Sequence, residues 1–126
     1  MAQDDEIIEQ IFDQAQEAVF LAIGERRNLN YGAKTLIVVS SLPSHRVGTD
    51  YVNSGIVIEN MVLAATDLGI DSCIMGAPIA ALAENAELLI SVEIPEGYAA
   101  PIIGAVFGYA TEDEQAHEHN ITFNRV

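Results

Sequence analysis

The hydrophobic and polar positions near the start of the chain recur with the period of a helix. Residues 4–27, DDEIIEQIFDQAQEAVFLAIGERR, carry apolar residues at positions 8, 11, 12, 15, 18, 19, 22 and 23. This spacing predicts an amphipathic helix that buries one face. Asp4 and Asp5 suit its N-terminal end, where the helix dipole is positive.

Three later runs of apolar residues predict strands. Residues 34–42, KTLIVVSSL, are β-branched and nearly uninterrupted, which predicts a strand buried on both faces. Residues 71–76, DSCIMG, predict a shorter strand. Residues 101–110, PIIGAVFGYA, predict a second core strand, in which Gly104 and Gly108 mark places where another backbone comes close.

A second long helix is predicted over residues 51–69, YVNSGIVIENMVLAATDLG, with Asp50 as its N-cap and Gly69 as its C′ residue. Its apolar residues lie on nearly every face, as expected of a helix in the middle of a protein or at a subunit interface. Brief helices near 79–84 and 84–91 and a turn over 94–98 follow.

This order of elements predicts a layered α+β or α/β fold. The length of 126 residues indicates one domain over residues 1–126. Within it, residues 111–120 are polar and acidic, and residues 121–126 suit an edge strand only weakly. We therefore expect residues 110–126 to form an extended arm whose last strand pairs with another subunit.

Charge and composition limit the classes of partner that the protein can bind. The chain has 19 acidic and 5 basic residues and a formal net charge of −14, which argues against nucleic acid or an anionic membrane surface as a partner. Half of its residues are hydrophobic, which favours contact with a second subunit. Neither a signal peptide nor a membrane span is recognisable. With a single cysteine, this predicts a cytoplasmic protein.

Side-chain chemistry alone offers weak candidates. Cys73 has no Lys or Arg within ten residues in sequence, so we predict a buried structural cysteine rather than a nucleophile. His117 and His119 share a face if extended, but no third ligand is suitably spaced, so a polar arm is favoured over a metal site. There is no P-loop, GxGxxG, HExxH or nucleophile elbow.

Four segments together resemble the FMN-dependent nitroreductase family: YGAKTLIVVSS, ENMVLAATDLGIDSCIMGAP, IPEGYAAPIIGAVFGYA and ITFNRV. The resemblance covers residues 31–126, and the first helix more loosely, which is the C-terminal half to two-thirds of the family's domain. It implies an α+β sandwich in an intertwined homodimer, whose C-terminal extension adds a strand to the partner's sheet. It also implies FMN at the interface, reduced by NAD(P)H and oxidised by a nitroaromatic, quinone or similar small acceptor in ping-pong order.

By position, the residues that match the segment along the flavin ring are Ile74, Met75, Gly76 and Ala77. Small residues at 76 and 77 fit that role, since bulk would block a planar ring. The same residues also suit an ordinary turn from a strand into a helix.

The family's Arg-rich N-terminal segment, which binds the FMN phosphate, has no match here, so the domain is shortened at its N-terminus. The resemblance leaves His119 and Arg125 as candidates for holding the phosphate. Two hypotheses remain open. The chain is either a flavin oxidoreductase that binds FMN non-covalently and weakly, or a nitroreductase-like domain without flavin catalysis, such as a small-ligand binder, a regulatory subunit or a partner-dependent half of an enzyme.

Overall fold

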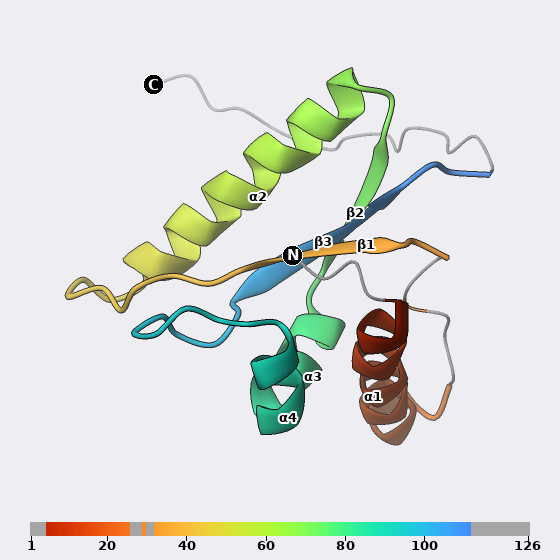
Figure 1. The fold of residues 1–126 in the computed structure, drawn as a ribbon, viewed down its shortest axis with the longest axis horizontal. Coiled ribbons are helices and arrows are strands. Elements are labelled where there is room, and N and C mark those ends of the chain that lie inside the picture. The colour runs from red at the N-terminus through yellow and green to blue at the C-terminus, as the bar shows by residue number, and fades with distance from the viewer. Residues whose placement is uncertain (1–4, 26–28, 30–31, 112–126) are drawn as a thin grey trace, which may run out of the picture.

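A computed structural model describes residues 5–25, 29 and 32–111, in which a small sheet separates one long helix from three others (Figure 1). The elements follow the order α1 (Asp5–Ile23), β1 (Thr35–Val39), α2 (Thr49–Asp67), β2 (Asp71–Met75), α3 (Ala77–Glu84), α4 (Ala86–Ser91) and β3 (Ile103–Gly108). The predicted α+β class is confirmed, and each predicted helix and strand within the described residues is present.

The three strands form an antiparallel sheet in the order β1-β3-β2. The central strand β3 pairs Val106 with Leu36 of β1 and with Cys73 of β2. Because β1 and β2 both run opposite to β3, their C-terminal ends lie at the same end of the sheet. Among the described strands, β1 and β2 are the two edges.

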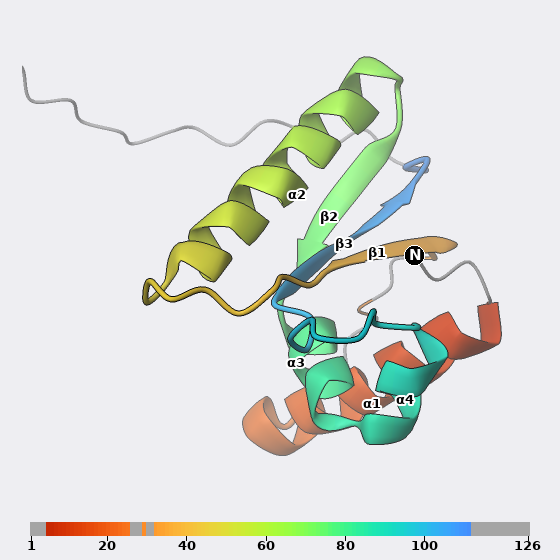
Figure 2. The same ribbon diagram turned by 60° about the vertical axis from the view of Figure 1, so that its left-hand side comes forward.

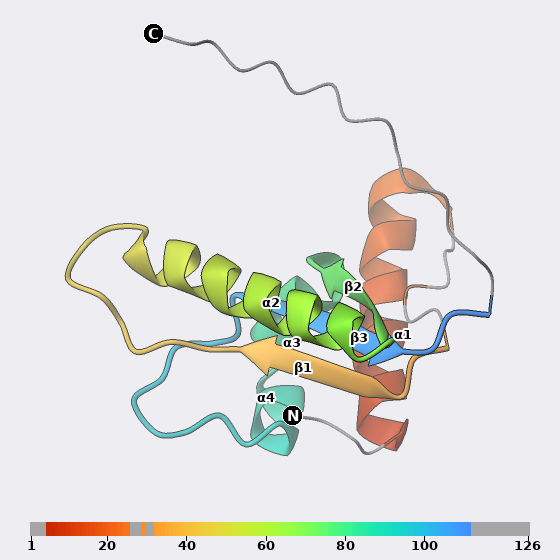
Figure 3. The same cartoon turned by 90° about the horizontal axis from the view of Figure 1, so that it is seen from above.

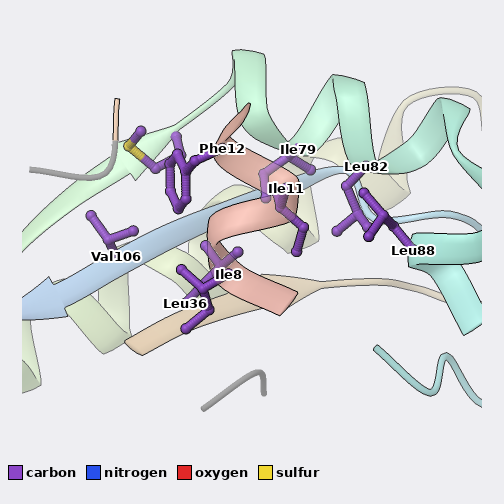
Figure 4. Close-up of a cluster of buried hydrophobic side chains, with 9 residues drawn as sticks. Ile8, Ile11, Phe12, Leu36, Ile79, Leu82, Leu88 and Val106 are labelled. Atoms are coloured by element: carbon purple, nitrogen blue, oxygen red, sulfur yellow. The ribbon is translucent and has the colours of Figure 1, made fainter. Parts of the chain in front are cut away.

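Helix α2 lies along one face of the sheet, and α1, α3 and α4 lie on the other (Figures 2 and 3). The main hydrophobic core fills the space between the sheet and these three helices (Figure 4). Its buried members are Ile8, Ile11, Phe12, Leu36, Met75, Ile79, Leu82, Leu88 and Val106. Burying side chains of this size stabilises the fold by about 1.5–3 kcal/mol each.

Helix α1 contributes to this core through its first half. The predicted positions 8, 11, 12 and 15 are buried, whereas Ala18 and Ala22 are exposed. The helical period is therefore correct over Asp5–Ile23, but α3 and α4 are short and cover only part of the apolar stripe of α1.

Helix α2 begins differently from the prediction and ends as predicted. Its N-cap is Gly48, at a φ of 81°, and Asp50 lies in the first turn rather than at the cap. The helix starts early because this glycine adopts the left-handed conformation that lets the chain turn into it. At the other end, the N–H of Gly69 donates to Thr66 O and that of Ile70 to Ala65 O, a Schellman motif that confirms Gly69 as C′.

The apolar surface of α2 is mostly uncovered. Within this helix only Ser54, Ile58 and Ala65 are buried. Its exposed large apolar residues are Tyr51, Val52, Ile56, Val57 and Leu63. The three strands are too few to cover a helix that is apolar on most sides, so the surface away from the sheet faces outward.

Strand β1 is less buried than predicted. Helices cover both faces of the sheet, but only Leu36 of this strand is fully buried and its other four residues are half-buried. An edge position explains the difference, because an edge strand has a neighbour on one side only.

The two glycines predicted to mark close approach of another backbone differ in the space around them. A Cβ at Gly104 would lie 2.7 Å from Ile37 O and 2.7 Å from Ile79 Cδ1, so this prediction is confirmed. A Cβ at Gly108 would meet Ala33 only at ordinary distances of 3.9 Å and more, so the prediction there is wrong. The beginning of β3 is crowded by α3, whereas its end is not.

Within the described ranges, none of the helices is both long and apolar enough to cross a membrane. The predicted turn over residues 94–98 is present, since the N–H of Tyr98 donates to Pro95 O at 3.1 Å. Most of the predicted arm and its edge strand, residues 112–126, lies outside the described residues.

Candidate functional site

The four residues expected to follow a flavin ring lie together where β2 passes into α3. Met75 ends the strand and is buried in the main core, where it belongs to the same cluster as Phe12. Ile74 points to the opposite face, because side chains alternate along a strand, and 46% of its surface is exposed. Met75 thus anchors the segment in the core, while Ile74 stays accessible to a ligand.

Gly76 and Ala77 form the open part of this junction. Gly76 is the N-cap of α3, and a Cβ built on it would meet no atom within 4 Å. Ala77 is also exposed. The first bond of the helix runs from the N–H of Ala80 to Gly76 O at 3.0 Å. The junction is therefore a patch of main chain with little side-chain bulk beside it.

The local sequence explains why the chain turns here. Pro78 sits in the first turn of α3, where its missing N–H costs nothing and its fixed φ favours the helix. Its side chain is buried, and Ile79 packs into the core behind it. Among the described residues, no side chain caps this helix start. The N–H of the exposed Ala77 is thus left without a side-chain acceptor, with the positive end of the helix dipole behind it.

Cys73, predicted to be buried, is exposed. It lies on β2, an edge strand, on the same face of the sheet as Met75. The helices on this face cover Met75 but leave Cys73 accessible. A short apolar run in an edge strand has the same sequence signature as a buried strand, so sequence periodicity did not reveal the exposure.

Positive charge is scarce around the junction. Lys34 forms an ion pair with Asp5 at 3.0 Å, beside the start of β1 and thus at the opposite end of the sheet from Gly76. Arg46 lies in the loop before α2. These are the only Lys and Arg residues in the part of the chain that the structure describes. His119 and Arg125, expected near a phosphate, lie outside that part.

Two surface hollows lie elsewhere. One of about 450 Å³ opens between α1 and α4, beside Gln10, Asp13 and Glu87. The other, of about 510 Å³, follows α4 and is lined by residues such as Ile90 and Tyr98. Neither includes residues 74–77. Since Ala77 is exposed and the space beside Gly76 is empty, the junction is an open surface in the single chain.

Among the described residues, no three His, Cys, Asp or Glu side chains gather in a group that could hold a metal ion. His117 and His119 are outside this range. The chemistry that the junction offers is instead that of a flat, uncharged surface with main-chain donors, which suits a planar heteroaromatic ligand.

Comparison with known proteins gives one family and several structures. The model of the nitroreductase family matches residues 3–109, further toward the N-terminus than the sequence motifs alone indicated. No curated protein matches the chain.

The similar solved structures are all described as nitroreductases. One from Desulfitobacterium hafniense with bound FMN is 26% identical and has a TM-score of 0.78; the match covers 98% of this chain and 73% of that one. A second with bound FMN, from Bacteroides fragilis, is 22% identical, with a TM-score of 0.69 and the same coverages. An FMN-dependent nitroreductase from Clostridium difficile is 24% identical, with a TM-score of 0.68, covering 99% of this chain and 76% of that one.

Proposed function

The chain belongs to the nitroreductase family, and from this premise we propose that it is an FMN-dependent oxidoreductase. It takes reducing equivalents from NAD(P)H and delivers them to a nitroaromatic, a quinone or a similar small acceptor. The observation that carries the proposal is the open Gly76–Ala77 junction, at the positions that match the family's flavin segment. The FMN bound in the similar structures supports the choice of cofactor.

The residues at the junction fit a flavin ring. A planar ring needs a surface without protruding side chains, and the space beside Gly76 is empty to 4 Å. Ile74 offers an exposed apolar side chain next to it. When bound there, FMN would supply the redox chemistry, accepting a hydride and passing two electrons to the acceptor. We assign Gly76 and Ala77 to orienting the ring through their main chain, and Ile74 to excluding water from one side.

Met75 has a different role in this proposal. Its side chain lies in the core with Phe12 and Val106, so it positions the junction from behind and contributes only its main chain to the site. A rigid support of this kind holds a binding surface in place.

For the phosphate of FMN, we propose His119 and Arg125, of this chain or of a partner subunit. This assignment follows the family resemblance. It is also consistent with the charges described above, since Lys34 is engaged by Asp5 at the other end of the sheet. A phosphate needs several donors, and arginine is well suited to supply two at once. Weak FMN binding is therefore expected whenever these residues are removed.

We further propose that the site is completed in a homodimer. The junction is open in the single chain, and α2 leaves five large apolar residues uncovered. A second copy would supply both a cover for α2 and further walls for the cofactor.

Titration of flavin-free protein with FMN tests the proposal. The substitution Gly76→Val adds bulk where the ring is expected, and the fold has room for it because a Cβ there meets nothing within 4 Å. We expect the Kd for FMN to rise by about tenfold or more, because the added group blocks the contact between the ring and the main chain. A tenfold rise corresponds to a loss of about 1.4 kcal/mol of binding free energy. Quenching of flavin fluorescence measures the binding.

The matched control is Ala86→Val, at an exposed position in the first turn of α4, which should leave the Kd within about twofold of the wild-type value. Equal Kd values for Gly76→Val and the wild type would contradict the placement of the ring. Wild-type protein that takes up no FMN would favour the alternative, a nitroreductase-like domain without flavin catalysis.

A further inference from the structure

The charges of this chain are distributed unevenly along the sequence. From residue 47 to residue 124 there is no Lys or Arg, whereas the same stretch holds twelve Asp and Glu residues. The stretch includes α2, β2, the Gly76–Ala77 junction, α3, α4 and β3. The Gly76–Ala77 junction therefore lies in a segment without fixed positive charge.

The positive charges that the structure does describe are not beside the junction. Lys34 is neutralised by Asp5 at 3.0 Å and lies at the opposite end of the sheet. Arg46 precedes α2, in the loop that leaves the end of β1. Its guanidinium makes no ion pair within the described ranges. The loop leaves the same end of the sheet as the junction, but Figures 1 and 2 show that it runs away from the start of α3 toward the start of α2.

The charged side chains that follow the junction along the chain are, in contrast, acidic. Glu84 ends α3, seven residues after Ala77, which is about 10 Å along a helix. Glu87 on α4 and then Glu93 and Glu96 come next, and all four are exposed. At low ionic strength the Debye length exceeds ~20 Å, so these charges and the net charge of −14 act on any ligand at the junction.

We propose that this charge distribution makes the site select NADH over NADPH. The inference rests on the proposed function, because it concerns the reductant of the same site. Both reductants carry the same nicotinamide, and each gives up one hydride to oxidised flavin. They differ in the 2′-phosphate of NADPH, which adds about two negative charges at pH 7. A field of this sign slows the approach and weakens the binding of the more negative ligand.

The ionic strength dependence of the two reductants tests this directly. With FMN-loaded protein, kcat/KM for NADH should exceed that for NADPH by about tenfold at ~0.02 M ionic strength. The ratio should fall to about twofold or less at ~0.5 M, because salt screens the field. The oxidised nucleotides NAD⁺ and NADP⁺ give a second readout without turnover, and calorimetry should give a lower Kd for NAD⁺ with the same salt trend.

Two charge-reversal variants distinguish the effect of acids near the junction on the NADH/NADPH ratio from the effect of the net charge of the whole protein. Glu84→Lys and Asp67→Lys each replace an exposed acid at the last residue of a helix and raise the net charge equally. Asp67 precedes β2 and so lies at the end of the sheet away from the junction. At ~0.1 M ionic strength, where the Debye length is about 10 Å, Glu84→Lys should lower the NADH/NADPH ratio by about threefold, and Asp67→Lys by clearly less.

The outcomes distinguish this inference from the function on which it rests. If the FMN-loaded protein oxidises NADPH as well as NADH, or if the ratio does not change with salt, the inference is wrong and the proposed function stands. A ratio unchanged by Glu84→Lys would also overturn it. Protein that binds FMN but oxidises neither nucleotide would instead count against the proposed function.

Discussion

At the scale of single residues, Gly104 is the described glycine at which the fold leaves least room for a side chain. It lies on the central strand, with Ile37 O of β1 on one side and Ile79 of α3 on the other. Either contact alone would be too short for a real Cβ. The absence of a side chain at this position therefore lets α3 pack directly onto the sheet and sets how closely the strand-to-helix junction approaches the core.

We predict that Gly104→Ala destabilises the protein by about 1–3 kcal/mol, because the new methyl group overpacks a site bounded partly by main chain. Chemical unfolding followed by circular dichroism measures the effect. Gly55→Ala serves as control: it lies inside α2, with nothing within 4 Å of the added Cβ. There the higher helix propensity of alanine should leave stability unchanged or raise it by up to about 1 kcal/mol. Similar losses in both variants would contradict the packing described.

Sequence reasoning located the crowded glycine but could not separate it from its neighbour. Gly104 and Gly108 have the same local context, two glycines in one apolar strand. They differ in their tertiary contacts, because Ile79 of α3 packs against Gly104 and no residue of α3 packs against Gly108. Tertiary contacts also explain the wrong prediction for Cys73. The residues around it are apolar, which predicted burial, but its strand has a neighbour on one side only and the side chain is exposed.

At the scale of elements, α3 and α4 are two short helices that are divided at a single residue, Asn85. Asn85 Oδ1 accepts hydrogen bonds from the N–H groups of Glu87 and Leu88, each at 3.0 Å. This caps α4 while α3 ends at Glu84. Leu88 then points into the core, so the cap fixes the direction in which α4 leaves α3.

We expect Asn85→Ala to lower the free energy of unfolding by about 1 kcal/mol, because two N–H groups at the start of α4 lose their acceptor. Asn53→Ala, at an exposed position within α2, is the matched control and should be neutral or slightly stabilising, since alanine favours a helix interior. Thermal unfolding of both variants decides the matter. An Asn85 variant as stable as the wild type would mean that the cap does not hold α4 in place.

Most elements were predictable because their signals are local. The helical period of α1, the glycine after α2 and the β-branched run of β1 each depend on neighbouring residues only. The order of the strands, β1-β3-β2, depends on contacts between distant segments and was not predicted. The start of α2 was missed by two residues, because a left-handed glycine replaced the expected side-chain cap.

At the scale of the whole molecule, the exposed apolar surface of α2 is the main feature that a single chain does not explain. Tyr51, Val52, Ile56, Val57 and Leu63 are all exposed. An uncovered apolar surface of this kind on a small acidic protein suits an interface. The candidate site could be placed from the sequence only through the family resemblance, because its residues are small and uncharged and carry no chemical motif of their own.

We predict that the protein is a dimer at micromolar concentration and that Ile56→Glu shifts it to monomers, because a charge would be buried without a partner. Val47→Glu is the control, at a fully exposed loop position before α2, and should remain dimeric. Sedimentation velocity distinguishes the species. Wild-type protein that sediments as a monomer under these conditions would contradict the prediction.

The central claim is that the chain uses a bound flavin for redox chemistry, and the visible spectrum of the FMN-loaded protein tests it most directly. We predict that the protein shows the absorption of oxidised flavin, that the band disappears when NADH is added without oxygen, and that it returns when a quinone or nitroaromatic acceptor is supplied. A protein that binds no added FMN in a titration, or whose flavin absorption persists with both NADH and NADPH, would contradict the account.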